Sequence, residues 1–271
     1  MAEFDAYQLL DRAVTAARAG AELAARQRVL GVGEIGTKST STDLVTAADR
    51  AVESLLEELL LDGHPDDGLL GEEGGETGGD DRTNSGVRWI VDPIDGTVNY
   101  VYGIPHYAVS VAAEVAGSVL AGVVVNAASG EEWTAVRGGG AWRSGIRLTG
   151  SAATGLDRAL VATGFGYDSA QRAYQARVLT SVLPRVRDIR RLGAAALDLC
   201  AAAEGRVDAY FEKGLNPWDH AAGGLIATEA GLLVTGLRGQ PPGPTMVLAG
   251  PPALHRQLHD LLVELDAGGG P

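Results

Sequence analysis

Residues 88–97 read RWIVDPIDGT, and this stretch decides how the fold of the whole chain is interpreted. The apolar run at its start favours a buried strand, because a proline and a glycine interrupt it too early for a helix. Asp92 stands at the end of that strand, held extended by the proline that follows it. Asp95 comes three residues later, and Thr97 is well placed to begin a short helix over residues 98–102. The stretch thus brings two carboxylates and a helix start into one small volume.

This arrangement suits a magnesium ion and a phosphate group. Magnesium prefers carboxylate and carbonyl oxygens in octahedral geometry, and a helix N-terminus offers N–H groups and partial positive charge to a phosphate. Taken alone, however, two aspartates at this spacing also describe an acidic turn with a helix cap, which is common at strand ends. The choice between the two interpretations depends on what the rest of the chain supplies.

Two other stretches add carboxylates at comparable positions. Residues 69–75 (LLGEEGG) read as a second strand that ends in Glu72 and Glu73, and residues 216–219 (NPWD) open an Ala- and Gly-rich helix over 220–230. Taken alone, Asp219 is better explained by helix capping, and the two glutamates could be a solvated pair. Together, carboxylates at two strand ends and one helix start are the supply that a site for several metal ions needs.

The same stretches resemble the signatures of a known family. Residues 71–73 (GEE), 89–99 (WIVDPIDGTVN), 218–223 (WDHAAG) and 229–231 (EAG) are similar, in order and spacing, to motifs of the inositol monophosphatase family. Residues 43–53 also match the family's segment before its first metal-binding strand, and the loop over 164–168 is closer to the bacterial members. The resemblance implies a Mg²⁺-dependent, lithium-sensitive phosphatase, a homodimer, and a five-layered α-β-α-β-α sandwich of mixed α/β class.

The resemblance also implies which residues bind metal. Glu72, Asp92 and the Ile94 carbonyl would hold one Mg²⁺, Asp92, Asp95 and Asp219 a second, and Glu72 would help to hold a weaker third through water. Such an acidic site repels a phosphate monoester unless cations invert its charge. We therefore expect metal occupancy to be a condition for substrate binding.

The family match assigns catalysis to three residues. Thr97 and Glu72 would position the attacking water for in-line displacement at phosphorus, so no covalent phosphoenzyme is needed. Asp49, which falls inside a predicted helix, would orient the threonine hydroxyl; without the resemblance it is interpreted as a solvated surface acid. Glu212 and the segment of small residues over 193–195 match the family's pocket for inositol or sugar hydroxyls. The substrate-binding residues implied in this way are Asp95, Gly96, Thr97, Gly193, Ala194, Ala195, Glu212 and Asp219.

The composition sets outer limits on function. With 271 residues, 45% of them hydrophobic and 21% charged, the chain is globular and long enough for a substantial core. A net charge of −13 argues against unspecific nucleic-acid binding. No apolar run reaches the ~20 residues of a membrane span, and the acidic start is unlike a secretory leader, so we expect a cytoplasmic protein. Cys200, the only cysteine, excludes an intrachain disulfide and is predicted to be buried.

The predicted first half covers residues 1–155 and carries Glu72, Asp92, Asp95 and Thr97. Its apolar periodicity predicts a long helix over 7–30 and a second one, capped by Asp43, that ends at 61. Between them the polar residues 31–43 predict a mobile hairpin or loop, and the glycine-rich residues 74–86 an exposed loop. Four strands over 107–113, 119–125, 132–136 and 140–142 are predicted to form an antiparallel sheet.

The predicted second half covers residues 156–271, carries Glu212 and Asp219, and alternates strands with helices. We expect the site to lie between the halves, so that neither half alone is active, and we expect the tail over 267–271 to be frayed. The predicted strands are 159–163, 188–191, 207–212, 232–235 and 246–249, and the predicted helices are 169–183, 194–204, 220–230 and 252–265.

The substrate is left open among several phosphate esters. The main prediction is hydrolysis of inositol-1-phosphate to inositol and phosphate; the alternatives are histidinol phosphate, a 3′-phosphoadenosine nucleotide or fructose-1,6-bisphosphate. Arg190 and Arg191 fit a second phosphate site, as a bisphosphate requires, or else a strand-end pair in salt bridges or a subunit contact. His220 is interpreted as structural or solvent-facing. A different class of function, binding a macromolecular partner with catalysis secondary, remains a third hypothesis.

Overall fold

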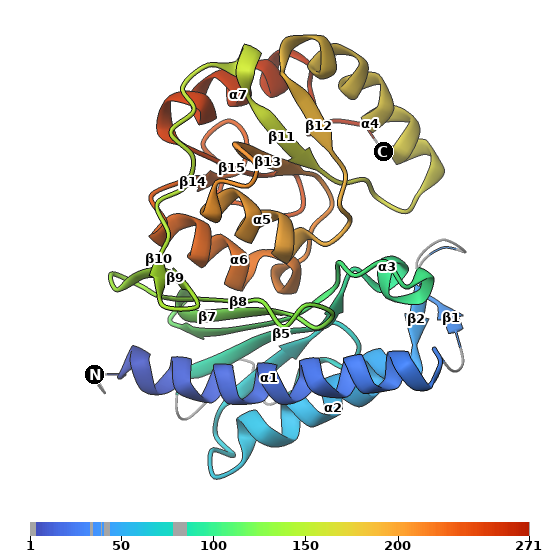
Figure 1. Ribbon diagram of the computed structural model, residues 1–271, viewed down its shortest axis with the longest axis vertical. Coiled ribbons are helices and arrows are strands. Elements are labelled where there is room, and N and C mark those ends of the chain that lie inside the picture. The colour runs from blue at the N-terminus through green and yellow to red at the C-terminus, as the bar shows by residue number, and fades with distance from the viewer. Residues whose placement is uncertain (1–3, 33–34, 39, 41–43, 78–85, 271) are drawn as a thin grey trace.

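The computed structural model describes residues 4–32, 35–38, 40, 44–77 and 86–270, and these residues form five layers (Figure 1). Helices α1 and α2 form the first layer and an eight-stranded sheet the second. Helices α5 and α6 form the central layer, a five-stranded sheet the fourth, and helices α4 and α7 the last. The predicted α-β-α-β-α sandwich is therefore confirmed.

The first layer is built from two amphipathic helices, α1 (Ala6–Leu30) and α2 (Ala47–Leu61). The small buried residues of α1 let it lie close to the sheet, as the burial of Ala13, Ala17 and Ala24 shows. The cap of α2 is Thr46, whose side chain accepts from the backbone of Ala48 and Asp49. The prediction of Asp43 as the cap is therefore wrong in position, and Asp43 itself lies outside the described residues. No described helix is long and apolar enough to span a membrane.

The hairpin predicted between these helices is present in part. Strand β1 (Ile35–Thr37) pairs antiparallel with β2 (Leu44–Thr46), in the register Ile35 opposite Thr46. Most of its tip falls outside the described residues, apart from Lys38 and Thr40. Because β2 leads directly into α2, the hairpin lies next to the start of that helix.

The larger sheet has the strand order β10-β9-β8-β7-β6-β5-β3-β4. Its strands from β5 to β10 pair antiparallel, which confirms the predicted antiparallel sheet, whereas β3 and β5 are parallel. The strands are β3 (Gly68–Gly71), β4 (Gly75–Thr77), β5 (Val87–Asp95), β6 (Ala108–Val115), β7 (Ser118–Asn126), β8 (Glu132–Val136), β9 (Gly140–Arg143) and β10 (Ile146–Arg147).

Two predictions about this sheet were wrong in detail. Residues 74–86 were expected to be a loop, but Gly75–Thr77 form edge strand β4, because the chain turns back at once and pairs with β3. Strand β5 does not stop at Pro93 either. It continues to Asp95 with a register shift against β6 between Asp92 and Asp95. This irregularity lets both aspartates point towards the same end of the sheet.

The smaller sheet has the order β12-β11-β13-β15-β14 and mixes parallel and antiparallel pairs. The alternation of strands and helices predicted beyond residue 156 is observed, with ends shifted by at most two residues except at the start of α6, which begins three residues earlier than predicted. The elements are β11 (Leu160–Thr163), α4 (Ser169–Val182), β12 (Asp188–Arg190), α5 (Ala195–Glu204), β13 (Ala209–Glu212), α6 (Pro217–Glu229), β14 (Leu233–Thr235), β15 (Val247–Gly250) and α7 (Pro252–Glu264), with 3-10 turns η1 (Leu156–Arg158) and η2 (Leu183–Arg185).

The central helix pair is packed closely because its contact residues are small. A Cβ on Gly122 of β7 would lie 3.0 Å from the Cα of Ala222 in α6, and one on Gly223 would lie 2.9 Å from the Cβ of Leu199 in α5. Cys200 is fully buried in the same layer, as predicted. Both sheets therefore share one core through α5 and α6.

The described part of the C-terminal tail is packed, contrary to the prediction that it is frayed. Ala267 is buried, the Tyr174 hydroxyl donates to the Asp266 carbonyl at 2.9 Å, and Lys213 Nζ donates to the Gly269 carbonyl at 2.7 Å. Small residues at the end of a chain give no periodic signal, so sequence patterns could not predict these contacts.

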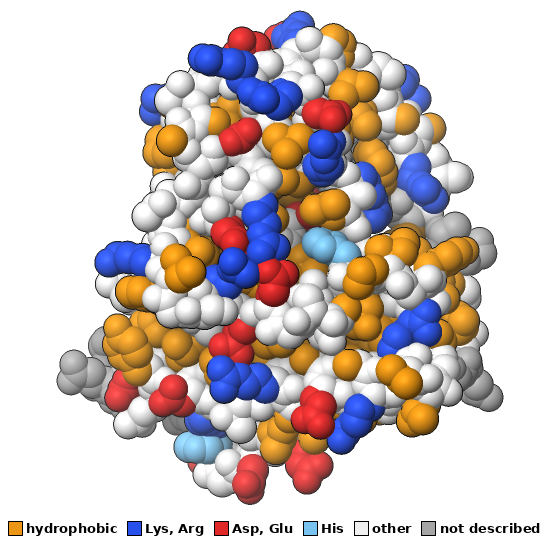
Figure 2. Space-filling model, viewed as in Figure 1, with side chains coloured by type: hydrophobic (Ala, Val, Ile, Leu, Met, Phe, Trp, Pro, Cys, Tyr) orange, Lys and Arg blue, Asp and Glu red, His pale blue; other side chains and the backbone are white. Residues whose placement is uncertain are grey.

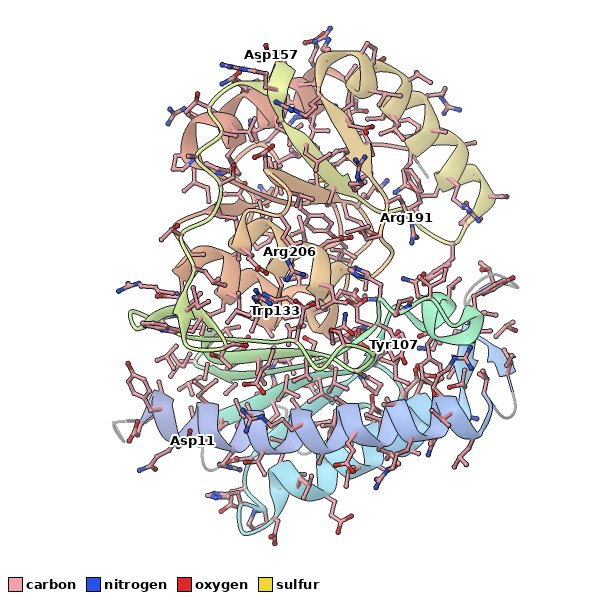
Figure 3. All side chains as sticks on the ribbon, in the orientation of Figure 1. Asp11, Tyr107, Trp133, Asp157, Arg191 and Arg206 are labelled. Atoms are coloured by element: carbon pink, nitrogen blue, oxygen red, sulfur yellow. The ribbon has the colours of Figure 1, made fainter. Side chains whose placement is uncertain are left out.

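On one face of the molecule, positively and negatively charged side chains lie next to one another and do not form separate patches. Figure 2 shows blue and red side chains side by side on this face, with hydrophobic ones between them. Among them, Arg143 and Arg206 both contact Glu131 and Glu204, and Arg206 lies over the ring of Trp133, as labelled in Figure 3.

A buried ion pair joins α1 to the larger sheet. Asp67 is 3% exposed, and its Oδ2 accepts from Arg12 Nη2 at 2.9 Å and from Trp89 Nε1 at 3.0 Å. We expect Asp67→Ala to lower the free energy of unfolding by roughly 2–4 kcal/mol, because Trp89 Nε1 loses its partner inside the protein and Arg12 keeps only the Leu60 carbonyl. Urea unfolding measures this change. The exposed neighbour change Asp11→Ala serves as control, at about 0.5 kcal/mol or less; equal effects would contradict the assigned role of Asp67.

Candidate active site

Three aspartates from two distant parts of the sequence meet at the junction of the two sheets. Asp92 and Asp95 come from the end of β5, and Asp219 comes from the first turn of α6. One carboxylate oxygen from each lies within 4.8 Å of the others. Asp92 is 1% exposed and Asp95 is 7% exposed. The structure therefore brings together three of the predicted metal ligands, although the first and the last of them, Asp92 and Asp219, are 127 residues apart in the sequence (219 − 92).

These aspartates open into a pocket of about 430 Å³. The Asp92 carboxylate has one oxygen, Oδ1, that is buried and has no hydrogen-bond partner in the described part of the chain. Of the predicted site residues, Ala194 and Asp49 do not line the pocket but lie directly behind it. The predicted residues that do line it are Glu72, Asp92, Ile94, Asp95, Gly96, Thr97, Gly193, Ala195, Glu212 and Asp219.

Glu72 reaches the same pocket but has a cationic partner there. Lys38 Nζ, from the hairpin after β1, lies 2.8 Å from Glu72 Oε1 and also contacts Glu73. The glutamates are therefore not the simple solvated pair of the alternative interpretation. Lys38 was not predicted as a site residue, because its partners are more than 30 positions away and the hairpin carries no motif.

Thr97 is held by a chain of hydrogen bonds that begins at the cap of α2. Its hydroxyl lies 3.1 Å from Asp49 Oδ1 and 3.0 Å from the Ile94 carbonyl oxygen. The other oxygen of Asp49 accepts from the backbone N–H of Thr46 at 2.7 Å and from its hydroxyl at 2.6 Å. Asp49 has no exposed surface, so the interpretation as a solvated acid is wrong, and its position fixes where the Thr97 oxygen points.

Asp95 links the two halves of the molecule. Its oxygens accept from the backbone N–H groups of Ala195, at 3.2 Å, and Ala196, at 2.7 Å, which form the start of α5. Gly96 makes this approach possible: its φ is +89°, and a Cβ there would lie 3.1 Å from the Ala194 Cβ and from the Gly193 carbonyl oxygen. A side chain at residue 96 would push the two halves apart.

Burial and mutual repulsion raise the pKa values of these acids. The pKa of Asp92 is raised well above its usual value by burial and by the charges of Glu72, Asp95 and Asp219. Burial, followed by the charge of Asp95, does the same to the pKa of Asp219. The pKa of Asp95 is raised to about 7, mainly by burial, against the two N–H donors that lower it. A bound cation would remove this repulsion.

Glu212 ends β13 on the opposite wall of the pocket. Its Oε2 accepts from the Tyr210 hydroxyl at 2.8 Å, and burial raises its pKa. A Cβ on Gly164 would overlap the Glu212 carboxylate, so a glycine is needed there. The predicted pocket-edge loop over 164–168 does line the pocket, through residues 165–168.

Comparison with known proteins decides the family. The model of the inositol monophosphatase family matches residues 5–266. The chain belongs to the inositol monophosphatase family. The inositol-1-monophosphatase SuhB of Mycobacterium tuberculosis is 49% identical over 211 residues, which are 75% of this chain and 72% of the relative. The Nus factor SuhB of Escherichia coli is 38% identical over 86% of each chain.

A solved structure agrees with this assignment. The IMPase of Thermotoga maritima has a TM-score of 0.86 and 30% identity, and the match covers 97% of this chain and 100% of that one. The present inositol monophosphatase family member is accordingly a phosphatase, and the family's enzymes depend on metal ions. Three carboxylates in one buried group, with an unpartnered oxygen among them, fit such an ion.

The raised pKa values predict how metal and pH affect the stability of this phosphatase. An acid whose folded-state pKa is raised binds more protons in the folded state, so without metal the protein should lose stability as pH rises from about 4 towards 7, through the pKa of Asp95. Mg²⁺ binds the ionised carboxylates, so it should restore stability mainly at high pH.

Thermal unfolding at pH 5 and pH 8, in EDTA and in Mg²⁺, measures this effect. We expect Mg²⁺ to raise Tm by at least about 3 °C more at pH 8 than at pH 5. Asp92→Asn, which removes one charge of the group, should reduce that difference. An equal Mg²⁺ effect at both pH values would contradict the assignment of the acids to a metal site.

Proposed function

We propose that this phosphatase is a Mg²⁺-dependent phosphomonoesterase that hydrolyses inositol-1-phosphate to inositol and phosphate. The observation that supports this most is the grouping of Asp92, Asp95 and Asp219 within 4.8 Å, in the same pocket as Thr97 and Glu212. The name of the M. tuberculosis relative, an inositol-1-monophosphatase, supports the substrate.

Two or three Mg²⁺ ions would be held by the acids of the pocket. We assign Glu72, Asp92 and the Ile94 carbonyl to one ion, Asp92, Asp95 and Asp219 to a second, and Glu72 to a third through water. When bound, Mg²⁺ lowers the pKa of a bound water and neutralises phosphoryl charge. Inhibition by Li⁺ is part of the same proposal.

Protein groups would orient the attacking water. We assign this to the Thr97 hydroxyl and the Glu72 carboxylate, which line the pocket on the side of the aspartates. Asp49 accepts from Thr97 and is itself held by two bonds from Thr46, so the threonine oxygen keeps one orientation. Water then attacks phosphorus in line with the leaving alkoxide, without a covalent intermediate.

The opposite wall would bind the alcohol part of the substrate. The Glu212 carboxylate is positioned by Tyr210 to accept from a substrate hydroxyl, and the segment 193–195 lines the pocket beside it. Hydroxyl recognition by a carboxylate suits a polyol phosphate. Other phosphate esters, namely histidinol phosphate, 3′-phosphoadenosine 5′-phosphate and fructose-1,6-bisphosphate, remain the alternative substrates.

A panel of these four esters tests the proposal. Phosphate release is measured for each with Mg²⁺, with EDTA, and with Mg²⁺ plus Li⁺. The proposal expects Mg²⁺-dependent, Li⁺-inhibited release with the highest kcat/KM for inositol-1-phosphate. A kcat/KM more than about tenfold higher for another ester, which corresponds to about 1.4 kcal/mol, would show that the proposed substrate is wrong. The proposed metal site would still stand.

A role with a macromolecular partner is a second candidate, because the E. coli relative is named a Nus factor. The complete set of acids in the pocket favours catalysis. An Asp92→Asn variant that retained the full cellular role would support the second candidate instead. We also propose that the protein is a cytoplasmic homodimer, as the family resemblance suggests. Its molar mass by light scattering tests the dimer.

A further inference from the structure

Two aromatic side chains line the pocket, and the proposed mechanism assigns no role to either of them. Phe165 and Tyr167 lie in the same pocket as the three aspartates and Glu212, and among the described residues that line it they are the only aromatic ones. Both belong to the loop that joins β11 to α4 (Figure 1). The Tyr167 side chain is 40% exposed, so a ligand in the pocket can reach it.

This loop has a fixed position beside Glu212. A Cβ on Gly164 would overlap the Glu212 carboxylate, so the backbone at the start of the loop lies directly against that acid. The N–H of Gly166 donates to Gln175 Oε1 at 3.0 Å, and Asp168 accepts from two N–H groups in the first turn of α4, both at 2.9 Å. Each aromatic residue lies between two of these contacts in the sequence, so the backbone that carries each ring is held on both sides.

Tyr167 is the better placed of the two rings to contact a ligand. Phe165 also lines a narrow second cavity, together with Val178, Phe211 and Met246, which belong to the core under the smaller sheet. Part of the Phe165 ring therefore packs against the protein itself. Tyr167 does not line that cavity. Phe165 thus supports the wall, whereas Tyr167 presents its ring to the active-site pocket.

The wall combines a hydroxyl acceptor with an aromatic surface. The Glu212 carboxylate accepts from Tyr210, and Gly164, which touches that carboxylate, directly precedes Phe165. A cyclic polyol such as inositol has hydroxyl groups around its rim and C–H groups on its faces. The hydroxyls suit a carboxylate, and the C–H groups suit the negative face of an aromatic ring. An acyclic polyol has no rigid apolar face to place there.

We propose that Tyr167, supported by Phe165, packs against one face of the substrate ring, so that the pocket prefers phosphates of cyclic polyols to phosphates of acyclic ones. This inference rests on the proposed phosphomonoesterase function and adds a second recognition element to it. The phosphate would lie at the aspartates, the ring hydroxyls at Glu212 and the ring face at Tyr167. Because Tyr167 would contact no reacting atom, it should contribute to substrate binding more than to the chemical step.

Two esters, one with a ring and one without, test the proposal. Inositol-1-phosphate is compared with glycerol-2-phosphate, which carries its hydroxyls on an open chain, for the full-length wild type, Tyr167→Ala and Tyr167→Phe in saturating Mg²⁺. Tyr7→Ala, which removes a 61% exposed tyrosine outside the pocket, is the matched control and should change neither rate. We expect Tyr167→Ala to lower kcat/KM for inositol-1-phosphate about 3- to 10-fold, mainly through KM, as the loss of one aromatic contact implies. The value for glycerol-2-phosphate should change less than about twofold, and Tyr167→Phe, which keeps the ring, should stay within about twofold of the wild type on both esters.

The contrary results are distinct from one another. Equal losses on both esters, or a fall in kcat at unchanged KM, would overturn the inference, because the ring would then serve the fold or the chemical step. A loss from Tyr167→Phe as large as that from Tyr167→Ala would also overturn it, because the hydroxyl and not the ring would be the group in use. So would a wild type with equal kcat/KM for the two esters. A wild type that releases no phosphate from any ester in Mg²⁺ would instead refute the proposed function itself.

Discussion

Asp92→Asn is expected to lower kcat by more than about 10³-fold, because Asp92 contributes to two of the proposed metal positions and an amide binds Mg²⁺ far less well than a carboxylate. Asp92 is also the most central acid of the group: burial and three neighbouring acids all raise its pKa. Its replacement therefore removes a ligand and changes the balance of charge at once. Steady-state phosphate release from inositol-1-phosphate measures the effect.

Loss of the fold is easily separated from loss of the site in this variant. The change removes a repelling charge from a buried group, so without metal Asp92→Asn should unfold at the same temperature as the wild type or higher. The rise in Tm on adding Mg²⁺ should be much reduced. Asp157→Asn, an exposed change outside the pocket, is the control and should alter neither quantity. Near-normal turnover by Asp92→Asn would refute the site assignment.

Thr97→Ala is expected to have the second largest effect, about 10²- to 10³-fold on kcat, within the range for groups that orient a reacting proton or water. The Thr97 hydroxyl is buried and has two acceptors within 3.1 Å, so the position of its oxygen is fixed. The residue lies beside the aspartates but holds no metal in the proposed site. KM and Mg²⁺ binding should therefore change little.

Conservative variants distinguish orientation of the water from a general loss of packing. Thr97→Ser keeps the hydroxyl and should recover most of the activity, within about tenfold of the wild type. Asp49→Asn keeps the shape but weakens the acceptor for Thr97, and should cost about 10- to 100-fold in kcat. If Thr97→Ser were as inactive as Thr97→Ala, the methyl contacts of the residue and not its hydroxyl would be the important feature.

The acids of the pocket were predictable as candidate metal ligands because each stands at a boundary that local sequence marks. Asp92 precedes a proline after an apolar run, and Asp219 follows an Asn-Pro pair at the start of a helix. Local patterns could not show that they meet in space. That step depended on the family resemblance, since 127 residues separate Asp92 from Asp219 (219 − 92).

Sequence reasoning missed Lys38 and could not separate the roles of Arg190 and Arg191, because tertiary structure decides the surroundings of all three residues. Lys38 lies in a segment that was predicted as a mobile hairpin or loop, and its ion pair with Glu72 exists because β1 and β2 bring it to the pocket. Arg191 and Arg190 are adjacent in sequence, yet one contacts Asp188 and the other lines the pocket. Side chains at the end of a short strand alternate in direction, which residue type alone does not reveal.

The capping of α2 shows how a local rule was applied at the wrong residue. Asp43 and Thr46 are both good cap residues. Thr46 has in addition an acid three positions later, Asp49, which completes a capping box. Recognising that box would have given both the start of the helix and a reason for the burial of Asp49. The cap and the support of Thr97 use the same carboxylate.

The most direct test of the account is phosphate release from inositol-1-phosphate by metal-free protein as Mg²⁺ is added back. The account predicts no release in EDTA, a rise in rate that saturates with Mg²⁺, and no such rise for Asp92→Asn. Release by the metal-free protein at the full rate, or an equal response to Mg²⁺ from Asp92→Asn, would contradict the claim that the carboxylates between the two sheets form a metal-dependent phosphatase site.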